Sequence, residues 1–94
     1  MAILKIDTPC GFEARVDEDA MQDLEIYETV RAFYAAIKGG DDIPDLRGAC
    51  AALLGEQGWN AFVAFEKKRF GKVRVDHVGE TIHAVLTGLD SKKK

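Results

Sequence analysis

The chain has 94 residues, of which 47% are hydrophobic and 31% are charged, a composition typical of one globular domain with a modest core. A domain of this size has little material for a deep catalytic cleft, which argues against a self-contained enzyme. The net charge of −3 is divided unevenly, because residues 1–46 hold eleven acids and four bases whereas residues 47–94 hold nine bases and five acids. Such opposed charge can steer a partner or a second copy of the chain, or form two solvated faces.

Two short strand-like runs open the chain, at residues 2–7 and 12–17. In the second run Phe12, Ala14 and Val16 alternate with charged residues, as in a half-buried strand. Between the runs, the Thr-Pro-Cys-Gly segment at residues 8–11 has the composition of a turn. We therefore predict a β-hairpin at residues 2–17 that lies on helices, because two strands alone are only marginally stable.

A first helix is predicted from Asp19, whose carboxylate would cap it, to about Lys38, just before two glycines that favour a left-handed end. Its expected buried face is an apolar arc flanked by two tyrosines, Ile26, Tyr27, Val30, Phe33, Tyr34 and Ile37. Met21 and Leu24 fall outside that arc. We therefore expect these two side chains either to meet the hairpin or to remain exposed.

Aspartates at positions 41, 42 and 45 and a proline at 44 predict the start of a second helix, which ends at Gly55. Its expected core face is Leu46, Ala49, Cys50, Leu53 and Leu54. A third helix is predicted from residue 58 to Phe70, capped by Gly71. Glu66 interrupts its apolar stripe and Phe65 stands off it, so Phe65 either joins a broad core or is partly exposed at an interface.

A fourth helix is predicted to start near Asp76, with an apolar face of Val78, Ile82, Val85, Leu86 and Leu89. Gly88 and residues 90–94, which end in three lysines, are expected to form a frayed basic tail. The predicted fold is therefore mainly α, a single domain over residues 1–94 with an N-terminal β-hairpin followed by a bundle of four helices at residues 19–89.

The residues that could carry chemistry form no recognisable pattern. Cys10 and Cys50 are forty residues apart without a CxxC, so we expect both to be reduced and predict no zinc site and no disulfide. His77 and His83, six residues apart on one predicted helix, point about 120° away from each other and are expected at the surface. No nucleophile or phosphate-binding motif is present. We therefore expect a non-enzymatic protein with no cofactor and no metal.

The densest basic segment is residues 67–74, with five bases and one aromatic residue. Such a segment can grip phosphates, which makes a small nucleic-acid-binding regulator the alternative function. The same cations also complement the dipole at the end of a helix, and the overall negative charge would repel a nucleic-acid backbone. Because there is no apolar run of ~20 residues and no signal peptide, we expect a cytoplasmic protein with no membrane partner.

Several motifs, taken in their order along nearly the whole chain, resemble the tail assembly chaperones of long-tailed bacteriophages and prophages. They are GFEARVDED at residues 11–19, DLEIYE at 23–28, Asp42-Ile43-Pro44, LLGEQ at 53–57 and GKV at 71–73 ahead of an amphipathic helix. The sequence departs from the family pattern at Tyr27, Thr29 and Glu66, where leucine is common in the family.

This resemblance implies a non-enzymatic helper that coats the helical tape measure protein, helps to recruit tail tube protein and is absent from the mature virion. It also implies a longer product made by ribosomal frameshifting near the end of the gene, where the codons of Lys92, Lys93 and Lys94 can form an adenine run. We expect recognition of an amphipathic helix by an exposed apolar patch. The candidate partner-binding residues are Met21, Leu24, Phe65 and Phe70.

Overall fold

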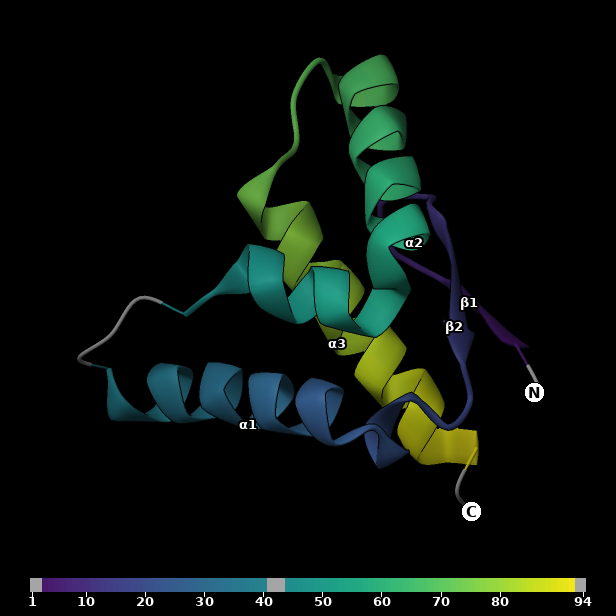
Figure 1. Cartoon of the computed structure of the whole chain (residues 1–94). Coiled ribbons are helices and arrows are strands. Elements are labelled where there is room, and N and C mark those ends of the chain that lie inside the picture. The colour runs from purple at the N-terminus through teal and green to yellow at the C-terminus, as the bar shows by residue number, and fades with distance from the viewer. Residues whose placement is uncertain (1–2, 41–43, 93–94) are drawn as a thin grey trace.

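The structure, a computed structural model, describes residues 3–40 and 44–92 (Figure 1). Its elements in chain order are β1 (Ile3–Asp7), β2 (Glu13–Asp17), a 3-10 turn (Ala20–Gln22), α1 (Leu24–Gly39), α2 (Leu46–Phe70) and α3 (Val75–Lys92). The predicted class, mainly helical with an N-terminal β-hairpin, is confirmed. The prediction of four helices is wrong, because residues 3–40 and 44–92 form three α-helices.

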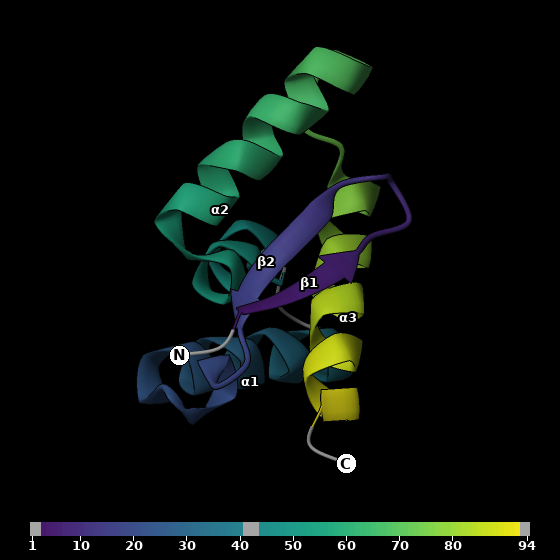
Figure 2. The ribbon, with the colours of Figure 1, turned by 90° about the vertical axis from the view of Figure 1, so that its right-hand side faces the viewer.

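The hairpin pairs β1 and β2 in antiparallel register, with Ile6 opposite Ala14. Its turn is closed by Thr8, whose backbone N–H and side-chain hydroxyl both donate to the Phe12 carbonyl, at 3.1 and 2.8 Å. Gly11 occupies this turn at a φ of 97°. Ala14 and Val16 are buried, so one face of the hairpin lies against the helices. Figure 2 shows the two strands crossing beside α2 and α3.

Helix α1 starts at a different residue from the one predicted. Asp19 makes no side-chain capping bond, and a 3-10 turn separates it from the helix. The cap is Asp23, whose carboxylate accepts from the backbone N–H of Glu25 at 2.9 Å and of Ile26 at 3.4 Å. The predicted left-handed end is confirmed at Gly40.

The burial predicted for α1 holds only in its middle. Val30 and Phe33 are buried, whereas Tyr27, Tyr34 and Ile37 are exposed, contrary to the prediction. Figure 1 shows the C-terminal end of α1 reaching beyond α2 and α3. Ile37, in the last turn of α1, is 49% exposed because its helix extends past the core.

The second and third predicted helices form one element, α2, with a kink. Gly55 has φ 79° and ψ 168°, so it leaves the helical conformation at the residue where we predicted a helix end. No loop follows it, and the chain resumes the helix at once, which explains why two predicted helices became one. Of the predicted capping aspartates, Asp45 accepts from the Gly48 N–H at 2.9 Å, and those at 41 and 42 lie outside the described residues.

Helix α3 buries the predicted face, including Val78, Ile82, Val85 and Leu89. It starts at Val75, one residue before the expected position. Its end is not frayed from residue 90, because the helix continues to Lys92; Lys93 and Lys94 lie outside the described residues. A Cβ added at Gly88 would come within 2.7 Å of the Ile6 side chain, so this glycine permits the close approach of α3 to β1.

The buried apolar residues of the hairpin and all three helices form one core. Within residues 3–40 and 44–92, no helix has the length and apolar character needed to cross a membrane.

Candidate functional site

The four candidate partner-binding residues lie in two separate regions. Leu24 is 68% exposed at the start of α1, and Met21, in the 3-10 turn just before it, is half-buried against the core. Phe65 and Phe70 are half-buried near the end of α2. Figures 1 and 2 place the start of α1 and the end of α2 at opposite ends of the molecule. The four side chains therefore do not make one patch.

Leu24 is instead one of four large apolar side chains exposed on α1, which we call the α1 face: Leu24, Tyr27, Tyr34 and Ile37, exposed by 68, 39, 41 and 49%. At about 100° per residue, Leu24, Tyr27 and Tyr34 form a row within about 80° around the helix, and Ile37 lies about 60° beyond Tyr34. From Leu24 to Tyr34 the row extends for about 15 Å along the helix. Arg31 lies within it, with its guanidinium 5.7 Å from the centre of the Tyr27 ring and 3.3 Å from the Tyr27 hydroxyl. The α1 face is therefore apolar and aromatic, with one cation held over a tyrosine.

Charge flanks the α1 face unevenly. Glu25 and Glu28 are exposed beside its first half, and the residues leading into α1 add the acids Asp17, Glu18, Asp19 and Asp23. Lys38 lies at the other end. A partner helix with basic residues near one end of its apolar stripe would complement this arrangement.

Phe65 and Phe70 contribute mainly to packing within the chain. The Phe65 ring lies 5.4 Å from that of Phe12 and 6.3 Å from that of Phe70, measured between ring centres. Phe70 in turn packs edge-to-face on His77 at 4.6 Å. This aromatic cluster joins the hairpin turn, the end of α2 and the start of α3. Phe65 and Phe70, which we predicted to bind a partner, therefore also stabilise the fold.

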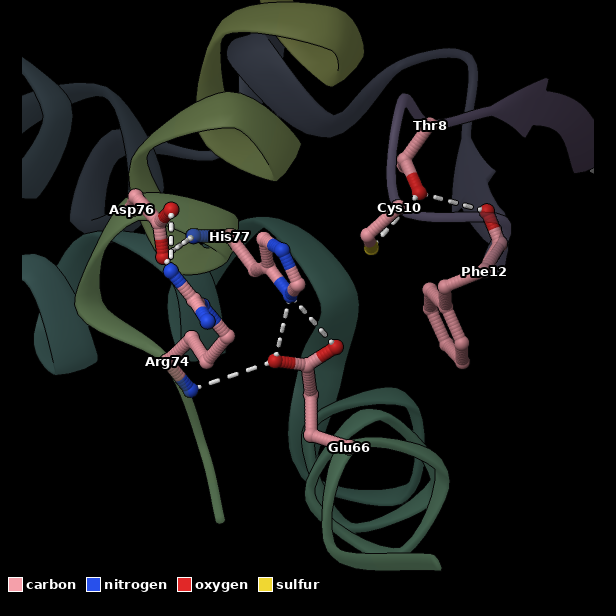
Figure 3. A network of polar contacts seen from close by, with 7 residues as sticks. All are labelled: Thr8, Cys10, Phe12, Glu66, Arg74, Asp76 and His77. Carbon is pink, nitrogen blue, oxygen red and sulfur yellow. Dashed lines mark hydrogen bonds and ion pairs between the residues drawn. The ribbon is translucent and has the colours of Figure 1, made fainter. Parts of the chain in front are cut away.

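A polar cluster around the buried side chain of Glu66 lies between the hairpin turn, α2 and α3 (Figure 3). Glu66 is fully buried, and its two carboxylate oxygens lie 2.9 and 3.0 Å from Nδ1 of His77. The same carboxylate accepts from the Arg74 backbone N–H at 3.1 Å. The expectation that His77 lies at the surface is wrong, because this carboxylate draws the imidazole inward; His83 is exposed, as predicted.

Cys10, on the hairpin turn, belongs to the same cluster. Its sulfur, a carboxylate oxygen of Glu66 and a ring nitrogen of His77 all lie within 4.8 Å of one another. The Thr8 hydroxyl lies 3.3 Å from the Cys10 sulfur. Sequence reasoning missed this group because its members come from three different elements. The one available signal was a glutamate that interrupts an apolar helical stripe.

The basic segment at residues 67–74 is partly neutralised. The Arg74 guanidinium makes two bonds to the Asp76 carboxylate, at 3.0 and 3.1 Å. This pairing lowers the pKa of Asp76 and raises the pKa of Arg74. Lys67, Lys68 and Arg69 are exposed in the last turn of α2, where cations complement the helix dipole.

Comparison of the chain with protein-family models, with curated proteins and with solved structures finds no match. Exposure and geometry thus define two candidate sites among the described residues. They are the α1 face and the cluster of Cys10, Glu66 and His77.

Proposed function

We propose that this protein is a non-enzymatic tail assembly chaperone, which binds the tape measure protein through the α1 face and helps to recruit tail tube protein. The sequence resemblance suggests the family. The observation that carries the proposal is the exposure of Leu24, Tyr27, Tyr34 and Ile37 along one helix, because a row of large apolar side chains in water is typical of an interaction surface.

The α1 face suits an amphipathic helical partner. Leu24, Tyr27 and Tyr34 lie within about 80° around the helix, so an apolar stripe on another helix can lie along these three side chains over about three turns. Tyrosines are favoured at interfaces, because a large apolar ring is buried while the hydroxyl stays hydrated. A contact made by so few side chains buries little surface, and interfaces of small area are weak and reversible. Reversible binding fits a helper that covers the tape measure protein in many copies and later leaves it.

The proposal is tested by co-expressing the chain with the tape measure protein of its own locus and measuring co-purification. Leu24→Asp and Tyr34→Asp should each reduce the recovered complex by at least about tenfold, because a carboxylate would enter an apolar contact. Val75→Asp is the matched control, since Val75 is 71% exposed and lies on α3, outside the α1 face. Retained capture by both α1 variants, or loss only in the Val75 variant, would contradict the proposed surface.

A salt series separates this function from the alternative of nucleic-acid binding by residues 67–74. Capture of the tape measure protein should persist at about 0.5 M salt, because apolar contacts carry it. Binding to a nucleic acid would weaken steeply over the same range as counterions compete for the phosphates. A complex that forms only at low salt, and only when nucleic acid is present, would favour the regulator.

A further inference from the structure

We propose that Cys10, Glu66 and His77 form a zinc-binding site. Their ligand atoms, a sulfur, a carboxylate oxygen and an imidazole nitrogen, lie within 4.8 Å of one another, and these are the three atom types that zinc takes from proteins. Figure 3 shows the three side chains approaching from different segments, the hairpin turn, α2 and α3. The inference is independent of the proposed function, because none of the three residues lies on α1.

The distances need only small adjustments to suit a tetrahedral ion. With zinc bonds of about 2.0 Å to nitrogen or oxygen and about 2.3 Å to sulfur, neighbouring ligands lie about 3.3 to 3.5 Å apart. Nδ1 of His77 and the Glu66 oxygen, now at 2.9 Å, would separate by a few tenths of an ångström. The Cys10 sulfur would move inward by up to about 1.3 Å, from at most 4.8 Å to about 3.5 Å from the other ligand atoms. It lies on the turn of the hairpin and not on a helix.

The charges also balance. A thiolate from Cys10 and the carboxylate of Glu66 cancel the charge of Zn²⁺, and a neutral His77 adds none. Binding releases the thiol proton of Cys10 to solvent. The Nδ1 proton that His77 donates to Glu66 in the structure also leaves to solvent, and Nε2 takes up one proton in exchange, so that the neutral imidazole offers the lone pair of Nδ1 to the metal. The sulfur and nitrogen ligands favour zinc over Ca²⁺ or Mg²⁺, which prefer oxygen.

Neighbouring groups are placed to support the ligands. The Arg74 N–H already donates to Glu66 at 3.1 Å and would keep that carboxylate oriented. The Thr8 hydroxyl, 3.3 Å from the Cys10 sulfur, can rotate to donate to a thiolate. The Phe12 carbonyl, which accepts from the Thr8 hydroxyl in the structure, would still accept from the Thr8 backbone N–H. Three protein ligands leave a fourth position for water. Cys10 is partly exposed and the side chain of His77 is 14% exposed, so an ion can enter.

The test uses the reduced, chelator-treated protein without a histidine tag and titrates it with Co²⁺, a spectroscopic substitute for zinc. We expect one ion per chain, with a thiolate-to-cobalt charge-transfer band and the intense visible bands of tetrahedral cobalt. Zn²⁺ should displace the cobalt and raise the melting temperature, because it binds the folded chain. Wild-type protein that stays folded but shows no thiolate band at saturating Co²⁺ would overturn the proposal.

Matched variants assign the ligands. Cys10→Ser should abolish the charge-transfer band, and His77→Gln should weaken cobalt binding by more than the roughly 10- to 100-fold that loss of an outer partner costs. Cys50→Ala and His83→Gln are the controls, because they replace the same residue types outside the cluster, and both should keep the band. A band that survives Cys10→Ser, or that His83→Gln removes as fully as His77→Gln does, would show that the cluster is only an internal hydrogen-bonded group and not a metal site. Circular dichroism of each chelated variant checks its fold.

Discussion

The buried carboxylate of Glu66 allows a quantitative prediction, because its role differs from that of an ordinary helical glutamate. In Glu66→Ala, two donors lose their acceptor: Nδ1–H of His77 and the backbone N–H of Arg74. Each buried donor left without a partner costs about 1 to 3 kcal/mol. The side chain of His77 is 14% exposed, so water recovers part of that cost. We therefore expect a loss of about 2 to 4 kcal/mol, a large share of the roughly 5 to 15 kcal/mol that stabilises a small domain.

Urea unfolding followed by circular dichroism measures this loss. With a slope of about 1 to 3 kcal/mol per molar urea, a loss of about 2 to 4 kcal/mol lowers the midpoint by roughly 0.7 to 4 M. Glu66→Gln should lose only about 1 kcal/mol, because its amide oxygen still accepts from Arg74 and its NH₂ can donate to a neutral His77. Glu56→Ala, at an exposed position of the same helix, should change stability by about 0.5 kcal/mol or less. A Glu66→Ala variant as stable as the Glu56 control would refute the reasoning.

Three further predictions concern exposure, backbone and pH. Leu24→Asp should keep its free energy of unfolding in urea within about 0.5 kcal/mol of wild type. Ile82→Asp, at a position 2% exposed, should give an unfolded chain by circular dichroism, and a stably folded Ile82→Asp variant would contradict the docking of α3. Gly55→Ala should lower the free energy of unfolding by about 1 to 3 kcal/mol in urea, because a φ of 79° strains any residue with a side chain. Gly79→Ala is the control and should raise the free energy of unfolding by up to about 1 kcal/mol, because a Cβ added there meets nothing within 4 Å. Equal effects of the two substitutions would contradict the kink at Gly55. Burial raises the pKa of the Cys50 thiol from 9.0 to about 12, so the contribution of the protonated thiol to the free energy of unfolding is complete below pH 9. This contribution is lost as the pH rises from 9 towards 12, by about 1.4 kcal/mol per pH unit. Urea unfolding at pH 8 and pH 10 should show this alkaline loss of stability in wild type and not in Cys50→Ala.

Local patterns were sufficient to predict most of the elements. The alternation of residues 12–17 and the turn composition before it predicted the hairpin, and glycines at 40 and 71 marked two helix ends. The apolar spacing of Val78, Ile82 and Val85 predicted the buried face of α3. These features depend on neighbours within a few residues, so the amino-acid sequence alone contains the information.

The residues that cap or interrupt the helices were predicted less well, because several neighbouring residues are suitable for the same role. Asp19 and Asp23 are both suitable caps, and the packing of the 3-10 turn decided for Asp23. Gly55 was identified as a break, but whether a loop or a kink follows depends on where the second half of α2 packs. Phe62 and Glu66 are buried there, and their burial keeps the chain helical immediately after the glycine.

Only the tertiary structure decided which surfaces are free and which distant residues meet. Tyr34 and Ile37 follow the same helical period as Phe33 and Val30, and they are exposed because α1 extends past the core. Cys10, Glu66 and His77 share no spacing, and they converge because the hairpin turn packs beside the end of α2 and the start of α3. Periodicity predicts the direction in which a side chain points from its own element, whereas the partner that it meets depends on long-range packing of other elements, which no local pattern records.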